Sequence, residues 1–558
     1  MSASSTIKTR NRSGQSPYTP KGRQLDANAI DEVRALLGDR SRQRDLLIEH
    51  LHLIQDQYGH LSAAHLTALA NEMKLAMAEV YEVATFYHHF DVVKEDEAVP
   101  AALTVRVCDG ISCEMNGAKD LLTELANTYG GGDVRVIHAP CVGACDRAPV
   151  AVVGQRQIHI ADAGSVGAAI EAGQTTPEIP DYMNLEAYLE NDGYVVWRSC
   201  LDGGRERERV ISTIEQSGLR GLGGAGFPTA RKWGFLKDTP KPRLLAINAD
   251  EGEPGTFKDR HCLEILPHQV LEGVLIAAWT VEAEAAYIYL RDEYPHIRTI
   301  LETEIARLEE ADLLGGIKLH LRRGAGAYIC GEESAMLESI EGKRGLPRNR
   351  PPFPAQAGLF GLPTLINNVE TMFWIKDILG NGAFWYESEG RPHFYSVSGR
   401  VVKPGVKLAP AGVTVRQLID DYCGGMLPGH SLKAYLPGGA SGGILPADKA
   451  DVALDFGSLD EFGCFTGSSA VVIFSEADNV RDICANLIGF FEDESCGQCT
   501  PCRVGCEKML KLIAAPSWDA ALIGELSETM RDASICGLGQ AAPNPVISAL
   551  RFFAEEVK

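Results

Sequence analysis

The sequence lacks both a long hydrophobic run and an excess of positive charge. Its richest apolar stretch, VLIAAWTV from Val274, is much shorter than the roughly eighteen apolar residues that a membrane-spanning helix requires. The formal net charge of −22 argues against a broad binding surface for nucleic acid or anionic lipid. The hydrophobic segment of a secretory signal is also missing. We therefore expect a cytoplasmic protein that binds neither nucleic acid nor membrane.

Without an export signal, the fifteen cysteines are expected to remain in a reducing compartment. In a reducing compartment, clustered cysteines bind metals more often than they form disulfides. With 45% apolar and 23% charged residues the composition is that of an ordinary globular protein, and 558 residues are too many for one hydrophobic core. The chain should therefore divide into several domains and use part of its cysteine for metal centres.

Residues 1–25 are rich in Ser, Thr, Lys and Arg and carry no acidic residue. A transit peptide is one interpretation, but the segment has no apolar face, and we expect a disordered tail. Residues 26–95 carry apolar side chains three and four positions apart, which predicts a small helical bundle with Ser62 as one N-cap. Adjacent positions on a helix point in different directions, so we expect His88 and His89 to be surface or interface residues rather than a metal-binding pair.

Residues 96–178 change to a two-residue period and predict a small α/β domain. Cys108 and Cys113 have four residues between them after its first strand, and Cys141 and Cys145 have three between them after the next. Two cysteines on each of two neighbouring loops suit a [2Fe–2S] cluster, because each iron takes two thiolates. A Cys₄ zinc site is the alternative, although zinc favours pairs with two intervening residues.

Residues 179–195 are interpreted as a linker, and residues 196–393 form the next predicted domain. Near its start stands the glycine-rich segment GLRGLGGAGFPTARKWGF, residues 218–235. Its glycines allow a phosphate to approach the backbone, and its Arg and Lys residues supply positive charge. The segment contains a G-x-G-x-x-G pattern, but the residues before it have helical rather than strand spacing, so it is not expected to be a Rossmann turn.

Three further loops of this domain place polar side chains after predicted strands. One, NADEGEPGTFKDR, has three carboxylates within four residues, which suit either a metal ion or the hydroxyl and amide groups of a nucleotide. Another, with the sequence YICGEE, opens a helix whose N-terminus favours phosphate or flavin. The last, RPPFPAQAGLFGLPTLINNVET, adds a phenylalanine and two amides. Ligands of open α/β sheets bind at the carboxyl ends of the strands, so the loops should meet around one ligand.

Residues 394–478 alternate short strands with glycine-rich turns, and residues 479–558 are predicted to be helical. The helical part carries Cys496, Cys499 and Cys502 in a C-x₂-C-x₂-C pattern, a strong [4Fe–4S] signal with zinc as the alternative. Cys506 completes a ferredoxin-like run, but Glu507 follows it in place of the usual proline. Residue spacing alone leaves the fourth ligand open.

The motifs GGAGFPT-x₂-KW, NADEGEPGTFKDR, YICGEE and PPFPAQAGL…INNVET resemble those of the NADH-binding, FMN-containing subunit of respiratory complex I. That resemblance covers residues 196–558. The pattern C-x₄-C…C-x₃-C and the segment ATFYHHF are similar to the thioredoxin-like [2Fe–2S] subunit of the same complex. Together the two resemblances span nearly all of the chain after the tail.

The resemblance implies the following roles. Residues expected around FMN are Gly221, Gly223, Gly224, Lys232, Asn248, Asp250, Tyr328, Gly331, Glu332, Asn367 and Asn368. Residues expected on NAD are Phe227, Phe235, Glu251, Glu253, Glu333, Arg350 and Phe353, the three aromatic ones around the adenine. Glu253 and Lys232 are the residues expected to take part in catalysis, and Cys536 is the implied fourth [4Fe–4S] ligand. Arg350 and Leu222 depart from the family, which has Lys and Arg at these positions in other members.

The expected fold is therefore multidomain α/β. It comprises a helical bundle, a thioredoxin-like [2Fe–2S] domain, a Rossmann-like FMN/NADH domain, a ubiquitin-like β-grasp insertion, and a C-terminal helical bundle with the [4Fe–4S] cluster. The implied activity is that of a diaphorase, which exchanges hydride with NAD⁺ or NADH at FMN and single electrons with one cluster of each kind. A non-catalytic zinc-binding scaffold is the rival class.

Three segments bear on the partner. GLRGLGGAGFP, PGGASGGILP and SICGLGQAAPNPV look most like the β subunit of soluble, molybdenum- or tungsten-dependent, NAD-linked formate dehydrogenases. This resemblance implies a pterin-containing α subunit with further iron–sulfur clusters as partner. The diaphorase subunit of a bidirectional NAD-reducing hydrogenase and a complex I-type NADH dehydrogenase subunit are the alternatives.

Overall fold

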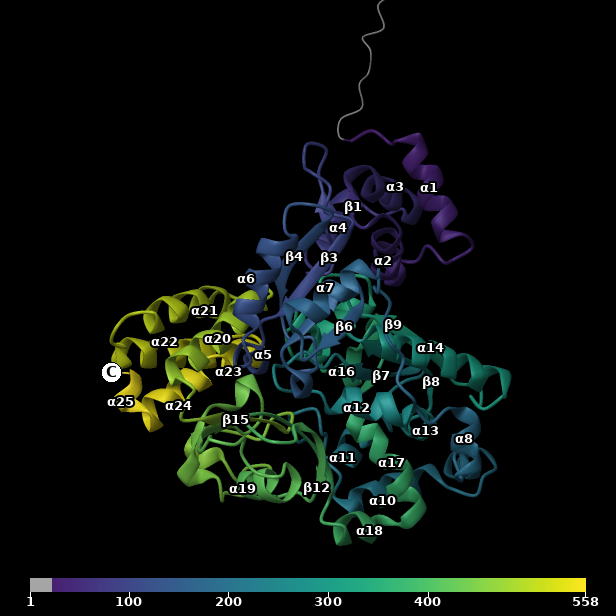
Figure 1. The fold of residues 1–558 in the computed structure, drawn as a ribbon. Coiled ribbons are helices and arrows are strands. Elements are labelled where there is room, and N and C mark those ends of the chain that lie inside the picture. Colours follow the sequence, from purple (N-terminus) through teal and green to yellow (C-terminus); the bar gives the residue numbers. More distant parts are fainter. Residues whose placement is uncertain (1–22, 558) are drawn as a thin grey trace, which may run out of the picture.

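The computed structural model describes residues 23–557, so nearly all of the predicted disordered tail lies outside the described residues. Figure 1 shows the N-terminal helices at the top and the C-terminal helices at the left. The domain that is expected to bind FMN and NADH, called the flavin-binding domain below, lies at the lower right. The thioredoxin-like domain lies between the N-terminal and C-terminal helices (Figure 1). The strands of residues 393–475 form a separate sheet at the bottom of the same view.

The N-terminal region is helical, as its periodicity predicts. Its elements are α1 (Ala27–Leu37), α2 (Leu47–Tyr58), β1 (Leu61–Ser62), α3 (Ala63–Met73), α4 (Met77–Ala84) and β2 (Val92–Val93). The predicted N-cap is confirmed, because the Ser62 side chain accepts a hydrogen bond from the His65 amide at 3.1 Å. Helix α4 ends at Ala84, so His88 and His89 lie beyond it, and the expectation that both belong to a helix is wrong.

The thioredoxin-like domain is built on a four-stranded sheet in the order β4-β3-β5-β6. Its elements are β3 (Leu103–Cys108), α5 (Ile111–Glu114), α6 (Ala118–Tyr129), β4 (Val134–Ala139), η2 (Cys145–Arg147), β5 (Val150–Val153), β6 (Arg156–His159) and α7 (Ala163–Glu171). Strands β3 and β4 are parallel neighbours, so the loops that leave their carboxyl ends lie side by side. One cysteine pair follows each of these two strands.

The segment interpreted as a linker contains a helix, α8 (Leu185–Glu190), that packs against the flavin-binding domain. Leu185 and Tyr188 are buried, and the Tyr188 hydroxyl donates to the buried Glu272 carboxylate at 2.7 Å. Burial raises the pKa of Glu272, and two backbone amides share its carboxylate with Tyr188. This part of the chain is therefore docked and does not act as a free tether.

The flavin-binding domain has a parallel four-stranded sheet in the order β10-β7-β8-β9. Its strands are β7 (Arg243–Ala249), β8 (Ala283–Leu290), β9 (Lys318–Arg323) and β10 (Thr364–Asn368). Its helices are α9 (Val195–Leu201), α10 (Arg207–Ser217), α11 (Thr229–Gly234), α12 (Lys258–Ile265), α13 (Pro267–Thr280), α14 (Pro295–Glu310), η3 (Tyr328–Gly331), α15 (Glu333–Ile340), α16 (Pro354–Ala357), α17 (Val369–Asn381) and α18 (Ala383–Ser388). Helix α10 precedes the glycine-rich segment, which agrees with the expectation that this segment is not a Rossmann turn.

Strands β7 and β8 are buried almost throughout, as expected for a parallel sheet that is covered on both faces. Helix α13 is also buried along nearly its whole length. No single helix within residues 23–557 combines the length and apolar composition of a bilayer span. Helices α12 and α13 have the length and apolar composition of a span only when they are taken together, and the chain bends by 100° between them.

Residues 393–475 form a five-stranded sheet in the order β12-β11-β15-β13-β14. Its elements are β11 (His393–Gly399), β12 (Gly405–Ala409), α19 (Val415–Gln417), β13 (Leu432–Leu436), β14 (Leu445–Pro446) and β15 (Ala470–Ser475). The remaining helices are α20 (Val480–Asp493), α21 (Thr500–Ile513), α22 (Ala520–Ala533), α23 (Gly537–Ala541), α24 (Asn544–Phe552) and α25 (Ala554–Val557). The helical character predicted for the C-terminal region is thus present in residues 479–557.

Candidate functional site

A cavity of about 320 Å³ lies beyond the carboxyl ends of the parallel strands β7 and β10. The glycine-rich segment, the carboxylate loop, the loop after β9 and the end of β10 all contribute to its wall. The predicted site residues that line it are Gly223, Gly224, Asn248, Asp250, Glu251, Glu253, Tyr328, Gly331, Glu332 and Asn368. The four loops therefore meet at one edge of the sheet, where ligands of α/β proteins bind.

Two positions in the cavity wall require glycine, because neighbouring atoms of the protein come too close for a side chain. A Cβ atom on Gly223 would stand 3.0 Å from the Cβ of Asn368, and one on Gly331 would stand 3.2 Å from the Asp250 carbonyl oxygen. Any larger residue would push these neighbours toward the cavity. The bare backbone leaves room for a flat ligand against the wall.

Two buried polar atoms beside the cavity have no protein partner. The Oδ2 atom of Asp250 and the Nδ2 atom of Asn367 are shielded from solvent and make no hydrogen bond. The neighbouring Asn248 is satisfied, because its amide donates to the Gly331 carbonyl at 2.8 Å and accepts from the Asp250 amide at 3.0 Å. Burial raises the pKa of Asp250 well above its ordinary value. An isoalloxazine ring carries both acceptor and donor groups, so FMN fits this pair of unsatisfied atoms.

Glu253 lies at the junction between the flavin-binding domain and the β11–β15 sheet. Its Oε1 accepts from the Ser441 amide at 2.9 Å, and its Oε2 accepts from the Ser468 hydroxyl at 3.2 Å. Burial raises the pKa of Glu253 despite these three donated hydrogen bonds, the third from the Ser441 hydroxyl. Both serines line the cavity, yet motif comparison did not identify them, because single serines in glycine-rich turns carry no spacing signal.

Glu251 supports the start of helix α12. Its carboxylate accepts from the backbone amides of Asp259 at 2.7 Å and Arg260 at 3.0 Å, and from the Tyr294 hydroxyl at 3.0 Å. Burial raises the pKa of Glu251 to about 7. The side chain that was predicted to contact NAD is thus committed to the helix N-terminus in this structure, and its contact with the dinucleotide stays a prediction.

Several predicted residues lie outside the main cavity and form a charged cluster. Lys232 contacts Glu333 at 3.2 Å, and Arg350 contacts both Glu333, at 3.1 Å, and Glu332. The Glu332 carboxylate also accepts from the Ser334 amide at 2.9 Å, as the N-cap of α15. The helix N-terminus that was expected to favour an external anion is therefore occupied by the protein's own carboxylate.

The three predicted adenine-contacting aromatic residues are all exposed: Phe227 at 39%, Phe235 at 51% and Phe353 at 52%. The rings of Phe227 and Phe235 lie 5.9 Å apart, and the Arg231 guanidinium lies 5.8 Å from the centre of the Phe227 ring. Phe235 and Arg231 also line a second cavity of about 610 Å³ between α10 and α11. Exposed aromatic rings suit stacking with a base, although they do not line the main cavity.

The first cysteine group is buried at the carboxyl ends of β3 and β4. All four side chains are free thiols, and the Sγ atoms of Cys141 and Cys145 are 3.3 Å apart. Cys108 contacts Cys113 on its own loop and Cys141 on the neighbouring loop. Two pairs on two loops match the donor set that two irons require.

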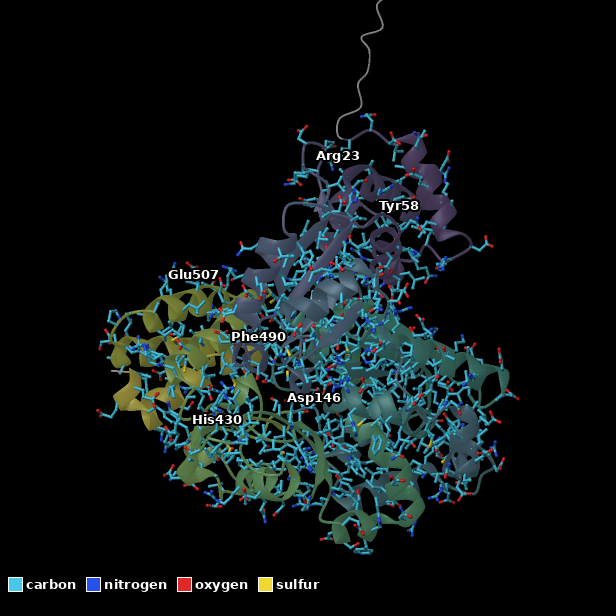
Figure 2. All side chains as sticks on the ribbon, in the orientation of Figure 1. Arg23, Tyr58, Asp146, His430, Phe490 and Glu507 are labelled. Atoms are coloured by element: carbon cyan, nitrogen blue, oxygen red, sulfur yellow. The ribbon has the colours of Figure 1, made fainter. Side chains whose placement is uncertain are left out.

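Two buried arginines connect this cysteine group to the flavin-binding domain. Arg291 donates to the carbonyl of Cys141 at 2.6 Å and also to the carbonyl of Glu251. Arg260 donates to the Gly143 carbonyl at 2.8 Å and to Asp146 at 3.0 Å, and Figure 2 labels Asp146 near the middle of the molecule. The loop that is expected to bind the cluster is therefore held directly against the cavity wall.

The second cysteine group lies at the N-termini of α21 and α23. Cys496, Cys499 and Cys536 are partly exposed, whereas Cys506 is completely buried one turn beyond Cys502 in α21. A Cβ on Gly539 would stand 2.7 Å from the Cβ of Cys502, so α23 approaches α21 closely. This packing brings the start of α23 next to the three-cysteine motif and supports Cys536 as the fourth ligand, which stays a prediction. Gly537 and Leu538, directly after Cys536, line the flavin cavity.

Comparison with known families finds three models along the chain. The thioredoxin-like [2Fe–2S] ferredoxin model matches residues 33–174, the Nuo51 FMN-binding domain matches residues 214–377, and the NADH-ubiquinone oxidoreductase-F iron–sulfur binding region matches residues 482–558. These matches confirm the predicted fold class and the three predicted prosthetic groups. They do not test the individual residues assigned to each group.

Comparisons with whole proteins find relatives of two kinds, NADH-quinone oxidoreductase subunits and an NAD⁺-reducing hydrogenase chain. An F-type subunit of the NADH-quinone oxidoreductase of Rhizobium meliloti, the second of that type, is 41% identical over 399 residues, which cover 68% of this chain and 94% of that protein. The corresponding NADH-quinone oxidoreductase subunit of Aquifex aeolicus is 38% identical over 68% of this chain and 91% of its own length. A solved chain of an NAD⁺-reducing [NiFe]-hydrogenase in the H₂-reduced state is 32% identical, with a TM-score of 0.82, and the match covers 93% of both chains.

Proposed function

This chain belongs to the family of F-type NADH-quinone oxidoreductase subunits and related diaphorases, and from that premise we propose that it is the diaphorase subunit of an NAD-linked formate dehydrogenase. At the level of the family it is a flavin- and iron–sulfur-dependent NADH oxidoreductase. The proposal adds a partner: a molybdenum- or tungsten-pterin α subunit that oxidises formate in the cytoplasm and passes the electrons to this chain. When bound, FMN supplies the exchange between a two-electron hydride and single electrons.

The observation that carries the diaphorase function is the position of the cavity between the two cysteine groups. Arg291 connects the carbonyl of Glu251 in the cavity wall with the carbonyl of Cys141. On another side, Gly537 and Leu538 extend the cavity wall directly from Cys536. A flavin in the cavity would therefore lie close to both metal-binding groups, as electron transfer requires.

We assign the chain's own residues to binding and orientation. Asp250 and Asn367 hold the polar edge of FMN, because each has a buried polar atom without a protein partner, and Asp250 and the neighbour Asn368 line the cavity. Glu253 orients the dinucleotide from the cavity wall, where Ser441 and Ser468 fix its carboxylate. Lys232 and Arg350 supply positive charge for the bound cofactors, and in this structure both contact the Glu333 carboxylate.

Three sequence segments support formate as the source of electrons: GLRGLGGAGFP, PGGASGGILP and SICGLGQAAPNPV, which resemble formate dehydrogenase β subunits. The fusion of the [2Fe–2S] and FMN halves disfavours an ordinary complex I subunit, where the halves are usually separate. The second candidate function is the diaphorase of an NAD-reducing hydrogenase. It is favoured by the likeness to the solved hydrogenase chain, which extends over both halves.

The native complex distinguishes the two partners. We expect the complex purified from its host to reduce NAD⁺ with formate, to contain molybdenum or tungsten, and to reduce CO₂ with NADH in the reverse direction. NAD⁺ reduction with H₂ alone, together with nickel in place of molybdenum or tungsten, would reject the formate proposal. The diaphorase function would survive that result, because the isolated chain would still reduce an artificial acceptor with NADH.

A further inference from the structure

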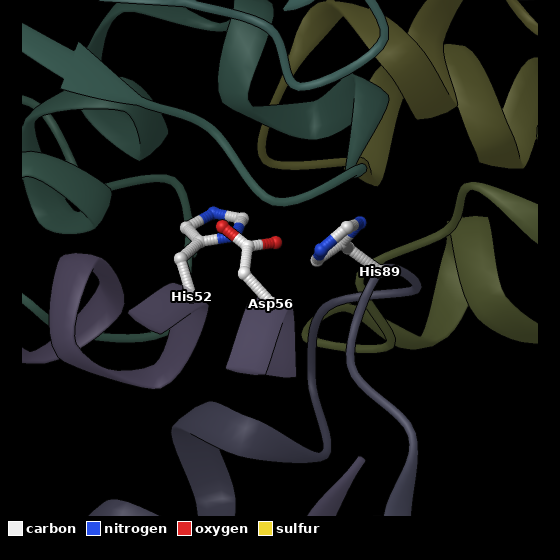
Figure 3. A group of neighbouring side chains, drawn as sticks. All are labelled: His52, Asp56 and His89. Carbon is white, nitrogen blue, oxygen red and sulfur yellow. The ribbon is translucent and has the colours of Figure 1, made fainter. Parts of the chain in front are cut away.

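A further group of metal-type ligands, which contains no cysteine, lies at the contact between the N-terminal helices and the flavin-binding domain. His52 and Asp56 stand four positions apart on α2 and therefore share one face of the helix. His89 comes from the segment after α4. One ring nitrogen of each histidine and one carboxylate oxygen of Asp56 lie within 4.8 Å of one another, and Figure 3 shows the three side chains gathered at one point.

Each histidine already donates its other ring N–H to a protein acceptor. The Nε2 atom of His52 lies 2.8 Å from the Gly324 carbonyl, which only accepts, so Nε2 carries the hydrogen. The Nδ1 atom of His89 lies 2.7 Å from the Asp292 carboxylate and donates to it. This arrangement is the one that metal-binding histidines use, because the outer acceptor fixes the tautomer and the ring orientation.

The remaining nitrogens are buried acceptors without a donor. His52 Nδ1 and His89 Nε2 are both shielded from solvent and have no hydrogen-bond partner. The His52 side chain is almost completely buried, with 2% of the residue exposed. Two unsatisfied lone pairs close together require a shared donor or a cation.

Charges of both signs surround the three side chains. Asp56 and Asp292 each contribute one negative charge, and Arg323 contacts Asp56 at 2.6 Å and Asp292 at 2.5 Å. Each of these carboxylates retains an oxygen lone pair beyond the one that Arg323 uses. Arg298 lies close enough to Arg323 and the two aspartates to interact with them electrostatically. Arg106 also interacts electrostatically with Asp292, so the arginines offset the two carboxylates, and the need for a donor or a cation comes from the two unpartnered ring nitrogens.

We propose that His52, His89 and Asp56 bind a divalent transition-metal ion of the zinc class. Two imidazoles and one carboxylate are a common three-ligand set for zinc, with water in the fourth position. Imidazole ligands also select this class of ion over magnesium and calcium, which prefer oxygen. The proposal departs from the expectation that His88 and His89 are surface or interface residues without a metal, because His89 joins His52 and Asp56 while His88 takes no part.

The position of the site indicates a structural role. Three consecutive backbone carbonyls, of residues 324–326, accept hydrogen bonds from this part of the chain. His52 Nε2 donates to the Gly324 carbonyl. The His89 amide donates to the Ala325 carbonyl at 3.1 Å, and the His88 amide donates to the Gly326 carbonyl at 3.2 Å. The same loop continues into Tyr328, which lines the flavin cavity. A metal that fixes His52 and His89 would therefore fix the loop on which one wall of the cavity is built.

The test measures metal content in the full chain with its iron–sulfur clusters and FMN in place. We expect about one zinc per chain in protein purified from zinc-supplemented medium, since one three-ligand site holds one ion. We expect His52→Ala and His89→Ala to lose it. The matched control is His88→Ala, which removes an exposed neighbouring imidazole and should keep the zinc. Iron and FMN content, measured on the same samples, report whether each variant has folded.

Two measurements on the unaltered protein keep the proposal testable if the histidine variants fail to fold. Zinc-edge X-ray absorption should show two imidazole ligands and no sulfur, which distinguishes this site from zinc bound at a cysteine group. Hydrogen exchange at residues 324–328 should become faster after chelation, while residues 500–513 stay unchanged. A zinc content that is equal in the wild type, His52→Ala and His89→Ala, or a sulfur-only zinc spectrum, would overturn the proposal.

Discussion

Arg291 joins the two halves of the chain, because its Nη2 donates to the carbonyl of Cys141 at 2.6 Å while its Nη1 donates to the carbonyl of Glu251. The guanidinium is buried, contacts the Glu293 carboxylate at 3.1 Å, and lies 5.0 Å from the centre of the Tyr294 ring. One side chain therefore connects the expected ligand loop of the [2Fe–2S] cluster to the wall of the flavin cavity.

Replacing this arginine should affect both stability and the cluster. Arg291→Met leaves two buried carbonyls without a donor, which should lower the free energy of unfolding by about 1–3 kcal/mol for each. The loss of a positive charge beside Cys141 should also lower the reduction potential of the [2Fe–2S] cluster, as measured by a redox titration followed by electron paramagnetic resonance. Arg291→Lys keeps the charge and should keep the potential. An unchanged potential in Arg291→Met would show that the guanidinium does not act on the cluster.

The two candidates for the fourth [4Fe–4S] ligand make opposite predictions. Cys536→Ser should lose the [4Fe–4S] signal, whereas Cys506→Ser should keep it, because Cys506 is completely buried within α21. The wild type should contain about six irons and one FMN per chain, since a [2Fe–2S] and a [4Fe–4S] cluster require that number. Iron analysis and low-temperature resonance spectra measure both quantities. If Cys506→Ser alone abolished the signal, the assignment of Cys536 would be wrong.

The convergence of the three loops that follow strands could be predicted from the sequence, because it depends only on local features. Strands of a parallel sheet end at the same edge, so polar side chains that follow them meet, as Asn248 and Asn368 do. The pairing of Cys108 with Cys141 follows from the same rule applied to β3 and β4. Spacing and periodicity are sufficient for such features.

Contacts between distant segments could not be predicted in this way. Ser441 binds Glu253 across 188 positions, and no local pattern marks either partner. Glu251 looked like a ligand-binding carboxylate, but the geometry of α12 commits it to the helix N-terminus. The approach of His89 to His52 was also missed, because the apolar periodicity predicted a helix through His89, whereas α4 ends at Ala84. Each of these features depends on tertiary packing.

Glu253 tests the role assigned to the carboxylate loop. Glu253→Ala should reduce kcat/KM for NADH with an artificial acceptor by about tenfold to hundredfold, the equivalent of one charge-assisted hydrogen bond of about 1.5–3 kcal/mol, while FMN is retained. Ser441→Ala is the matched control, because it removes a donor to the carboxylate but leaves the carboxylate in place. A loss of FMN from Glu253→Ala, with normal NADH kinetics in the fraction that keeps it, would contradict the assignment.

Glu49 on α2 should make stability depend on pH. Burial raises its pKa from 4.5 to about 7, so the folded chain keeps a proton that the unfolded chain releases above pH 4.5. Stability should therefore fall as the pH rises from about 4.5 to about 7, by up to about 3.5 kcal/mol, because each pKa unit corresponds to about 1.4 kcal/mol. Glu49→Gln should remove this part of the pH dependence in urea titrations, whereas Glu124→Gln, at an exposed position, should not. An identical slope in Glu49→Gln and wild type would refute the prediction.

Asn367→Ala gives the sharpest test of the flavin site, because it should weaken FMN binding without weakening the fold. The residue is 7% exposed and its Nδ2 atom has no partner in the protein. A buried donor without a partner costs about 1–3 kcal/mol, so Asn367→Ala should leave the FMN-depleted protein as stable as the wild type or more stable. If FMN satisfies this donor, the same substitution should raise the dissociation constant of FMN by about fivefold to tenfold, as the loss of a neutral hydrogen bond predicts. Fluorescence titration of the depleted protein measures the affinity, and its thermal midpoint measures the stability. Asn381→Ala, at the exposed end of α17, should change neither. Lower stability of the depleted protein together with unchanged FMN affinity would show that Asn367 supports the fold and does not bind the flavin.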